Sequence, residues 1–289
     1  MNQCHFIIGI PTYNRSHLIG RIIDSITSQP YSNWTILFLD DASQDETVSV
    51  LNKYKKNLKD RLFFYRMENN SGVNAARNRI IEEASRIDAN AYLLLIDDDD
   101  YLGDNCLEIA NSSILENPDY SWYTMNCIYK DGQLISKLKF YGALSYNYDY
   151  MFGKSIRGDL THIIRVSNIG AVRFSNKFRN AEEWFFWCSL SSKYNLYAIN
   201  AAGSIKEYLE GGLTKTDLNR DKVIDVLIYK IEVLSPIVGS KKLLHQHGSL
   251  VKHLLKAGRK KEAKHWLQVT FKISPCYLRQ YKFWLRLIF

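Results

Sequence analysis

One apolar run that ends abruptly in acids constrains the fold more than any other feature of the chain. Residues 91–96 read Ala-Tyr-Leu-Leu-Leu-Ile, and the next four residues, Asp97 to Asp100, are all carboxylates. Such a run is too short to span a membrane and is typical of a buried strand in a parallel sheet. Four acids at its carboxyl end repel one another unless a cation lies among them, and ligands of open α/β sheets bind at that end. The run predicts a divalent metal site for a phosphorylated ligand; a solvated acidic turn is the alternative.

Three other apolar segments precede this run, and a helical pattern follows each of them. The predicted strands are residues 6–10, 34–39, 62–65 and 92–96. Strands and helices that alternate at this spacing predict βαβ units, an α/β fold and a mostly parallel, doubly wound sheet. The polar segments after the strands would then converge along one edge of the sheet; they are residues 12–15, 40–41, 72–78 and 97–100.

The alternation loosens after Asp100. Residues 122–128 and 133–137 around Asp131-Gly132 predict a hairpin, and residues 140–178 are aromatic and irregular. Helical patterns return at residues 180–192, 217–237 and from 243 to the end. We therefore expect a domain over residues 1–215, with halves 1–100 and 101–215, followed by a helical region over residues 216–289.

The positive charge of the chain is concentrated near its carboxyl end. The net charge is +8, yet residues 241–289 carry +11, with Glu262 as their single acid, and the other 240 residues sum to −3.

Neither a transmembrane run nor a signal-peptide pattern appears. Five scattered cysteines without Cys-x-x-Cys spacing fit free thiols in a reducing cytoplasm.

Other phosphate-binding motifs can be tested against the loops. The sequence contains no P-loop motif, and the turn after the first strand reads Pro-Thr-Tyr-Asn-Arg, so it is not a dinucleotide-binding Gly-x-Gly-x-x-Gly loop. An Asp-x-Asp at a strand end also occurs in phosphatases of the haloacid-dehalogenase type. There the motif ends the first strand, whereas here it ends the fourth.

A set of short motifs occurs in order along residues 4–215. They are Pro11-Thr12-Tyr13-Asn14-Arg15, Ser28-Gln29, Leu39-Asp40-Asp41-Ala42-Ser43, Asn70-Ser71-Gly72, Ala76-Arg77-Asn78, Ile96 to Asp100, Glu182-Glu183-Trp184 with Trp187, and Glu210-Gly211-Gly212-Leu213-Thr214. Each motif alone is weak, but the ordered set resembles the family-two glycosyltransferases of the GT-A fold, in the branch that builds bacterial surface polysaccharides. The resemblance implies a Rossmann-like catalytic domain that binds a nucleotide sugar.

The resemblance assigns the nucleotide sugar to the loops at the sheet edge. Asp41 would accept the uracil N3–H, for which a charged acceptor is well suited, and Asp40 would bind nearby. The alternative for either acid is capping of the next helix. Arg77 would face the diphosphate; its alternative is a surface arginine on a helix. The remaining residues assigned to this site are Pro11, Thr12, Tyr13, Asn14, Arg15, Gly72, Asp97 and Asp98.

The same resemblance implies a metal and a base. Asp99 would bind Mg²⁺ or Mn²⁺ directly and Asp97 would assist it, because hard cations prefer carboxylate oxygens; Asp100 would support the loop. Glu183 aligns with the family's catalytic base, with Glu182 as the second choice, and the alternative for both is a pair of solvated acids at a helix N-terminus. Relatives carry a metal-reaching His before Gly-Gly, where this chain has Leu209; Glu210 is a weak substitute. His162 is expected to be structural.

Together these residues predict an inverting, metal-dependent transferase that moves a sugar from a UDP-sugar to a saccharide or lipid-linked saccharide. The alternatives are a Mg²⁺-dependent phosphatase with Asp97 as nucleophile and a non-catalytic scaffold of the same fold. Residues 276–289 read as a basic amphipathic helix, with Phe283 and Trp284, that binds an anionic membrane, packs on the protein or forms an oligomer interface. We expect a cytoplasmic protein, peripheral on the inner face of the membrane, that binds no nucleic acid.

Overall fold

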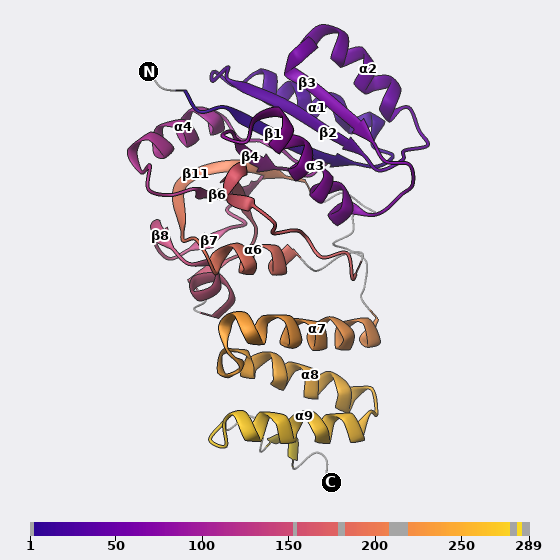
Figure 1. The fold of residues 1–289 in the computed structure, drawn as a ribbon, viewed down its shortest axis with the longest axis vertical. Helices are drawn as coiled ribbons and strands as arrows, with labels where there is room; N and C mark the ends of the chain where they lie inside the picture. Colours follow the sequence, from indigo (N-terminus) through magenta and orange to yellow (C-terminus); the bar gives the residue numbers. More distant parts are fainter. Residues whose placement is uncertain (1–2, 153–154, 179–182, 208–218, 278–281, 285–289) are drawn as a thin grey trace. The chain divides into compact units, whose positions relative to one another are not determined.

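The chain forms two compact units, residues 1–210 and 211–289. The structure, a computed structural model, describes residues 3–152, 155–178, 183–207, 219–277 and 282–284. Figure 1 follows the chain through both units. The border between the units falls in a segment outside the described residues, so the predicted border at residue 215 stays a prediction.

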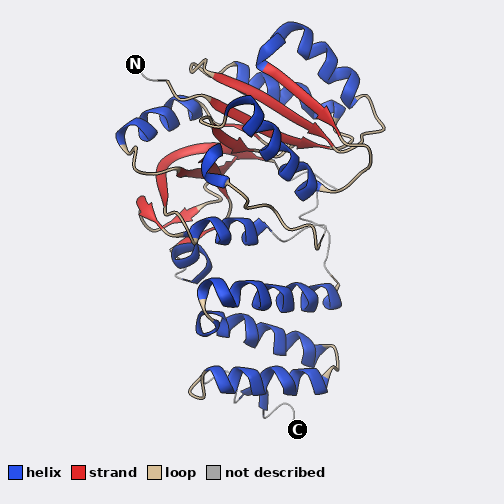
Figure 2. Cartoon of the chain, in the orientation of Figure 1, coloured by secondary structure: helices blue, strands red, loops and turns tan. Residues whose placement is uncertain are grey.

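The first unit is built on a nine-stranded sheet (Figure 2). Its order is β3-β2-β1-β4-β10-β6-β11-β5, with β8 paired to β11. The first four strands in this order are parallel, as predicted, and β10 then runs antiparallel between β4 and β6. The strands are β1 (Phe6–Thr12), β2 (Trp34–Asp40), β3 (Leu62–Arg66), β4 (Tyr92–Leu95), β5 (Tyr101–Leu102), β6 (Trp122–Tyr129), β8 (Gly142–Leu144), β10 (Leu160–Arg165) and β11 (Leu196–Lys206).

Helices cover both faces of the parallel half of the sheet (Figure 1). The helices of this unit are α1 (Ser16–Thr27), α2 (Thr47–Leu58), α3 (Val73–Asp88), α4 (Cys106–Glu116), α5 (Val166–Ile169) and α6 (Glu183–Ser191), with short helical turns η1 (Lys59–Arg61) and η2 (Tyr146–Phe152). Alternate residues of β1, such as Ile8 and Ile10, pack with Ile22 and Ile26 of α1 in one buried core. On the opposite face α3 approaches so closely that a Cβ on Gly9 would lie 2.5 Å from Ile80. Burial on two faces explains the uninterrupted apolar strands and confirms the predicted α/β fold.

Most strands of the second half were not expected from the sequence, and β10 and β11 are the longest of these. β10 lies within the stretch interpreted as irregular, and β11 carries no clean alternation of apolar and polar residues.

The predicted hairpin is only partly formed, because residues Ile128 and Leu134 make an isolated bridge. β6 pairs instead with β10 and β11, and β7 (Lys137–Leu138) pairs with β9 (Ile156–Arg157) in a separate small sheet. Long-range partners decide these pairings, so local patterning could not predict them.

The second unit is a stack of helices. They are α7 (Arg220–Val238), η4 (Ser240–Leu243), α8 (Leu244–Lys256) and α9 (Lys260–Ile273). Ile224, Leu250, Leu254 and Leu267 form its core, and Gly258 turns the chain between α8 and α9 with φ of +74°. Among the described helices none has both the length and the apolar character needed to cross a membrane.

The predicted amphipathic helix over residues 276–289 lies mostly outside the described residues, but two of its aromatic side chains are described. Phe283 is 8% exposed in the core of the helical unit, and Trp284 packs against that core. For these two residues the structure shows packing on the protein. Packing was one of the three predicted roles of the segment, beside membrane binding and an oligomer interface. An aromatic side chain buried in this way is not free to insert into a lipid surface.

Candidate nucleotide-sugar and metal site

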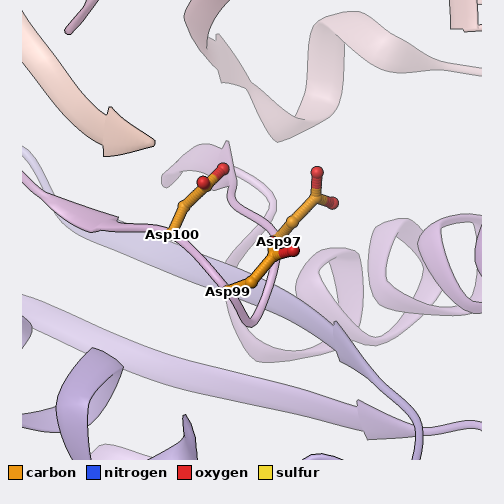
Figure 3. A group of neighbouring side chains, drawn as sticks. All are labelled: Asp97, Asp99 and Asp100. Carbon is orange, nitrogen blue, oxygen red and sulfur yellow. The ribbon is translucent and has the colours of Figure 1, made fainter. Parts of the chain in front are cut away.

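The acidic loop begins where β4 ends. Carboxylate oxygens of Asp97, Asp99 and Asp100 all lie within 4.8 Å of one another, and Figure 3 shows the three side chains on this one loop. Asp98 has a different partner, because the Thr12 hydroxyl donates to its Oδ2 at 2.7 Å. The end of β1 and the end of β4 are thereby joined at the edge where ligands of such sheets bind.

Burial and mutual repulsion govern the ionisation of this loop. Burial raises the pKa of Asp98 to about 7, and the charges of Asp99 and Asp97 add to the increase. Burial and the charge of Asp97 also raise the pKa of Asp99. Asp98 and Asp99 therefore hold their protons more tightly than ordinary aspartates do, which is expected where like charges share a site.

Arg77 connects this loop to the second half of the domain. Its Nη2 donates to Oδ1 of Asp97 at 2.8 Å, and its Nη1 donates to Oε1 of Glu183 at 3.0 Å. Burial lowers the pKa of the Arg77 guanidinium, but the two carboxylates outweigh burial and raise it. Arg77 is only 12% exposed, so it is not the surface arginine that was its alternative.

The two acids after β2 have different surroundings. Asp40 is fully buried; both its oxygens accept the Ser43 N–H at 3.2 Å, and its Oδ2 lies 3.3 Å from Nε of Arg66. Asp41 accepts the N–H groups of Ser71 and Gly72, each at 2.8 Å. Asp40 thus stabilises its own turn, and Asp41 fixes the loop that starts α3.

The turn after β1 brings the remaining predicted donor-site residues to the same edge. β1 continues through Pro11 to Thr12, two residues further than expected. Tyr13 is 40% exposed, and Asn14 adopts a left-handed backbone with φ of +53° while its side chain accepts the Gln44 N–H. Nε of Arg15 lies 3.9 Å from Asp98.

Three charged residues at this loop were missed by the sequence analysis. Nζ of Lys206, at the end of β11, lies 2.5 Å from Asp100. Arg21 of α1 donates to the backbone oxygen of Asp99 and pairs with Glu207. Residues 206 and 207 could not be assigned to the site because β11 was not predicted. The antiparallel pairing of β11 with β5 brings these two residues beside the acidic loop.

Glu183 is the first residue of α6, where a helix N-terminus favours a negative charge. Its side chain is 43% exposed, so it is accessible to a substrate and is not solely a solvated acid, since Arg77 holds it. Glu182, Leu209 and Glu210 lie outside the described residues. Arg77 therefore bonds two carboxylates at once, Asp97 through Nη2 and Glu183 through Nη1.

His162 has structural partners, as expected. Nε1 of Trp122 donates to its Nδ1 at 3.1 Å, and the Trp187 ring lies 3.8 Å away between centroids. Burial lowers the pKa of His162 to about 3. The imidazole is therefore neutral at physiological pH and is held as a hydrogen-bond acceptor.

The donor set of the acidic loop fits a hard divalent cation. Three carboxylates offer oxygen atoms close enough to share one ion, and Mg²⁺ and Mn²⁺ prefer such oxygen ligands. Asp97 and Asp99 are the predicted ligands, and Asp100 belongs to the same cluster. Two members of the cluster already have an ion-pair partner: Asp97 pairs with Arg77, and Asp100 pairs with Lys206.

Comparison with known proteins agrees with this arrangement. The family model of glycosyl transferase family 2 matches residues 7–177. A relative from Escherichia coli, UDP-Glc:alpha-D-GlcNAc-diphosphoundecaprenol beta-1,3-glucosyltransferase WfgD, is 27% identical over 199 residues, which are 69% of this chain and 74% of the relative.

Solved structures share the fold at low sequence identity. Residues 1–349 of TarS of Staphylococcus aureus, in complex with UDP-GlcNAc, superpose with a TM-score of 0.66 at 18% identity, covering 86% of this chain and 71% of those TarS residues. A mannosyltransferase from Pyrobaculum calidifontis, in complex with GDP-Man and Mn²⁺, has a TM-score of 0.56 at 15% identity and covers 100% of this chain and 86% of its own. The sheet, the acidic loop and the family match over more than half of the chain lead to one conclusion: the protein belongs to glycosyl transferase family 2.

Proposed function

We propose that this protein transfers a sugar from a UDP-sugar to a saccharide or lipid-linked saccharide, with inversion, in bacterial surface polysaccharide synthesis. The observation that carries the proposal is the position of Arg77 between Asp97 on the donor side and Glu183 on the acceptor half. Support for the substrates comes from WfgD, whose name includes a UDP-Glc donor and a diphosphoundecaprenol-linked acceptor, and from the UDP-GlcNAc bound to TarS.

In the proposed donor site, Thr12 and Tyr13 shape the base pocket and Asp41 accepts the uracil N3–H. Asp41 already accepts two backbone N–H groups, and a carboxylate has lone pairs for further donors. Arg77, with Arg15 beside Asp98, places positive charge near the predicted diphosphate position. Asp40 contributes through its turn, because it is fully buried.

In the proposed reaction, Glu183 takes the proton of an acceptor hydroxyl as that oxygen attacks the anomeric carbon. The bond from this carbon to the diphosphate oxygen breaks on the opposite side, and UDP leaves, so one displacement inverts the configuration. Asp99 and Asp97 would hold Mg²⁺ or Mn²⁺, which when bound neutralises negative charge on the departing diphosphate. Arg77 keeps Glu183 oriented through the hydrogen bond from its Nη1 to Oε1 of Glu183.

One assay separates the candidate activities. The protein is incubated with UDP-sugars, Mn²⁺ and a saccharide acceptor, and the products are analysed. Release of UDP with glycosylated acceptor is the expected result. Release of inorganic phosphate would instead indicate the phosphatase alternative, and no turnover with any donor would indicate a non-catalytic scaffold.

We also propose that the basic helical unit binds an anionic membrane surface, which places the protein at the inner face of the cell membrane. The support for this proposal is positive charge. Five lysines are exposed on α8 and α9, namely Lys252, Lys256, Lys261, Lys264 and Lys272. Each basic residue near an anionic leaflet contributes about 1 kcal/mol to binding. Co-sedimentation with anionic vesicles at low salt, with release as salt rises, is expected. Equal recovery with neutral and anionic vesicles would contradict the proposal.

A further inference from the structure

Lys206 and Asp100 form an ion pair that the strand register builds. β11 runs antiparallel to β5, with Ile205 opposite Tyr101. The next position in this register places residue 206 opposite residue 100, and side chains of directly opposed residues point to the same face of a sheet. Nζ of Lys206 and Oδ2 of Asp100 are accordingly 2.5 Å apart.

Burial makes this pair costly to separate. The side chains of Lys206 and Asp100 are 18% and 5% exposed. A buried charge that loses its partner is strongly destabilising, because water cannot replace the partner. A metal ion coordinated by Asp100 would have to displace Lys206 from this carboxylate.

The other two acids of the cluster are placed differently. Asp97 is also paired, by Arg77 through Oδ1, but its side chain is 39% exposed against 5% for Asp100, so it stays accessible to another ligand. Among the residues that the structure describes, no ion pair involves the carboxylate of Asp99. The side chains of Asp97 and Asp99 are also more exposed than that of Asp100.

We propose that Lys206 is a resident cation that removes Asp100 from the metal-ligand set and leaves Asp97 and Asp99 as the protein ligands. The ammonium also repels a divalent ion held by the same cluster. Two carboxylates beside a fixed positive charge bind Mn²⁺ weakly, so the ion depends on oxygens of the donor diphosphate for most of its affinity. This inference rests on the proposed function, in which metal and nucleotide sugar occupy the site together.

The test measures Mn²⁺ binding by calorimetry and by the electron paramagnetic resonance signal of free Mn²⁺, without nucleotide and then with UDP. The wild type should bind Mn²⁺ weakly alone and at least tenfold more tightly with UDP. Lys206→Met keeps the length of the side chain, removes the repulsion and frees Asp100, so nucleotide-free affinity should rise at least tenfold. Lys206→Arg keeps the charge and should resemble the wild type.

A double variant keeps the test decisive if Lys206→Met folds poorly. Lys206→Met with Asp100→Asn leaves no buried unpaired charge and preserves the net charge of the cluster. If Asp100 is not a ligand, its nucleotide-free Mn²⁺ affinity stays within about threefold of the wild type. A tenfold loss in the double variant, or unchanged affinity in a folded Lys206→Met variant, would overturn the role of Lys206. A wild type in which UDP brings no increase in Mn²⁺ affinity would instead count against the metal dependence of the proposed function.

Discussion

Arg77 donates to Glu183 across 106 positions of sequence, at 3.0 Å between Nη1 and Oε1. The same guanidinium donates to Asp97 through its other terminal nitrogen. One side chain therefore ties the candidate base to the loop that is expected to hold the donor. A substitution of Arg77 should therefore affect both donor binding and the position of the candidate base.

Replacing Arg77 by Ala should weaken donor binding and lower turnover by about 10²–10³-fold, the usual effect of removing one preorganised charge from an active site. Arg77→Lys should recover part of the loss, since it restores charge without the two-pronged geometry. Arg79→Ala is the matched control on the same helix, because Arg79 pairs only with Glu82 and Glu83 in the described contacts. Steady-state kcat and KM for the donor give the comparison; equal losses in the two alanine variants would show a merely structural role.

Two adjacent acids can be separated by their effect on turnover. Glu183→Gln should leave UDP affinity intact and reduce turnover by about two to four orders of magnitude, the usual contribution of general-base catalysis. Glu182→Gln should reduce it less. Single-turnover rates beside UDP titrations provide the measurement, and a larger effect at residue 182 would move the base to that residue.

UDP binding should strengthen when Mn²⁺ is present, and Asp99→Ala should abolish the increase, because Asp99 is the predicted direct ligand. Asp104→Ala is a suitable control, since Asp104 is exposed and lies just beyond the acidic loop. Calorimetry with and without Mn²⁺ decides the point. If the wild type binds UDP equally well in both conditions, the assigned metal role is wrong.

Acidification should destabilise the helical unit through His247. This side chain is 1% exposed, and burial lowers its pKa from 6.5 to about 4. The unfolded chain binds the proton more readily, so stability is complete above about pH 6.5 and falls as the pH approaches 4, by up to about 3 kcal/mol. Denaturant unfolding between pH 7 and 4 should show a steeper loss for the wild type than for His247→Gln, whereas the exposed-site control His265→Gln should keep the wild-type slope.

Phe283 should contribute to stability because it is buried in the core of the helical unit. Phe283→Ala is expected to cost about 3 kcal/mol, as do other large aromatic truncations in protein cores. Phe271→Ala is the control at a 44% exposed position and should change stability by less than about 0.5 kcal/mol. Melting curves test this directly. An unchanged melting temperature for Phe283→Ala, with loss of vesicle binding, would return this residue to the membrane-insertion interpretation.

The local pattern of the sequence was sufficient for the first half of the fold, which holds the parallel strands β1, β2, β3 and β4. Apolar strands followed by helical periodicity predicted the parallel sheet, and the acids after residue 96 predicted the edge at which the functional loops meet. These features are local, since a strand buried on both faces must be apolar along its length. Gly9 is part of the same logic, because α3 packs against it without room for a Cβ.

Only the tertiary structure decided the partners of those loops. β10 enters the sheet antiparallel between β4 and β6, and β11 brings Lys206 to Asp100, although neither strand has a pattern that its own residues reveal. The pair of Arg77 with Glu183 depends on the same long-range assembly. Strand register and side-chain pairing are determined by which surfaces can be buried together, and that is a property of the whole domain rather than of any short segment.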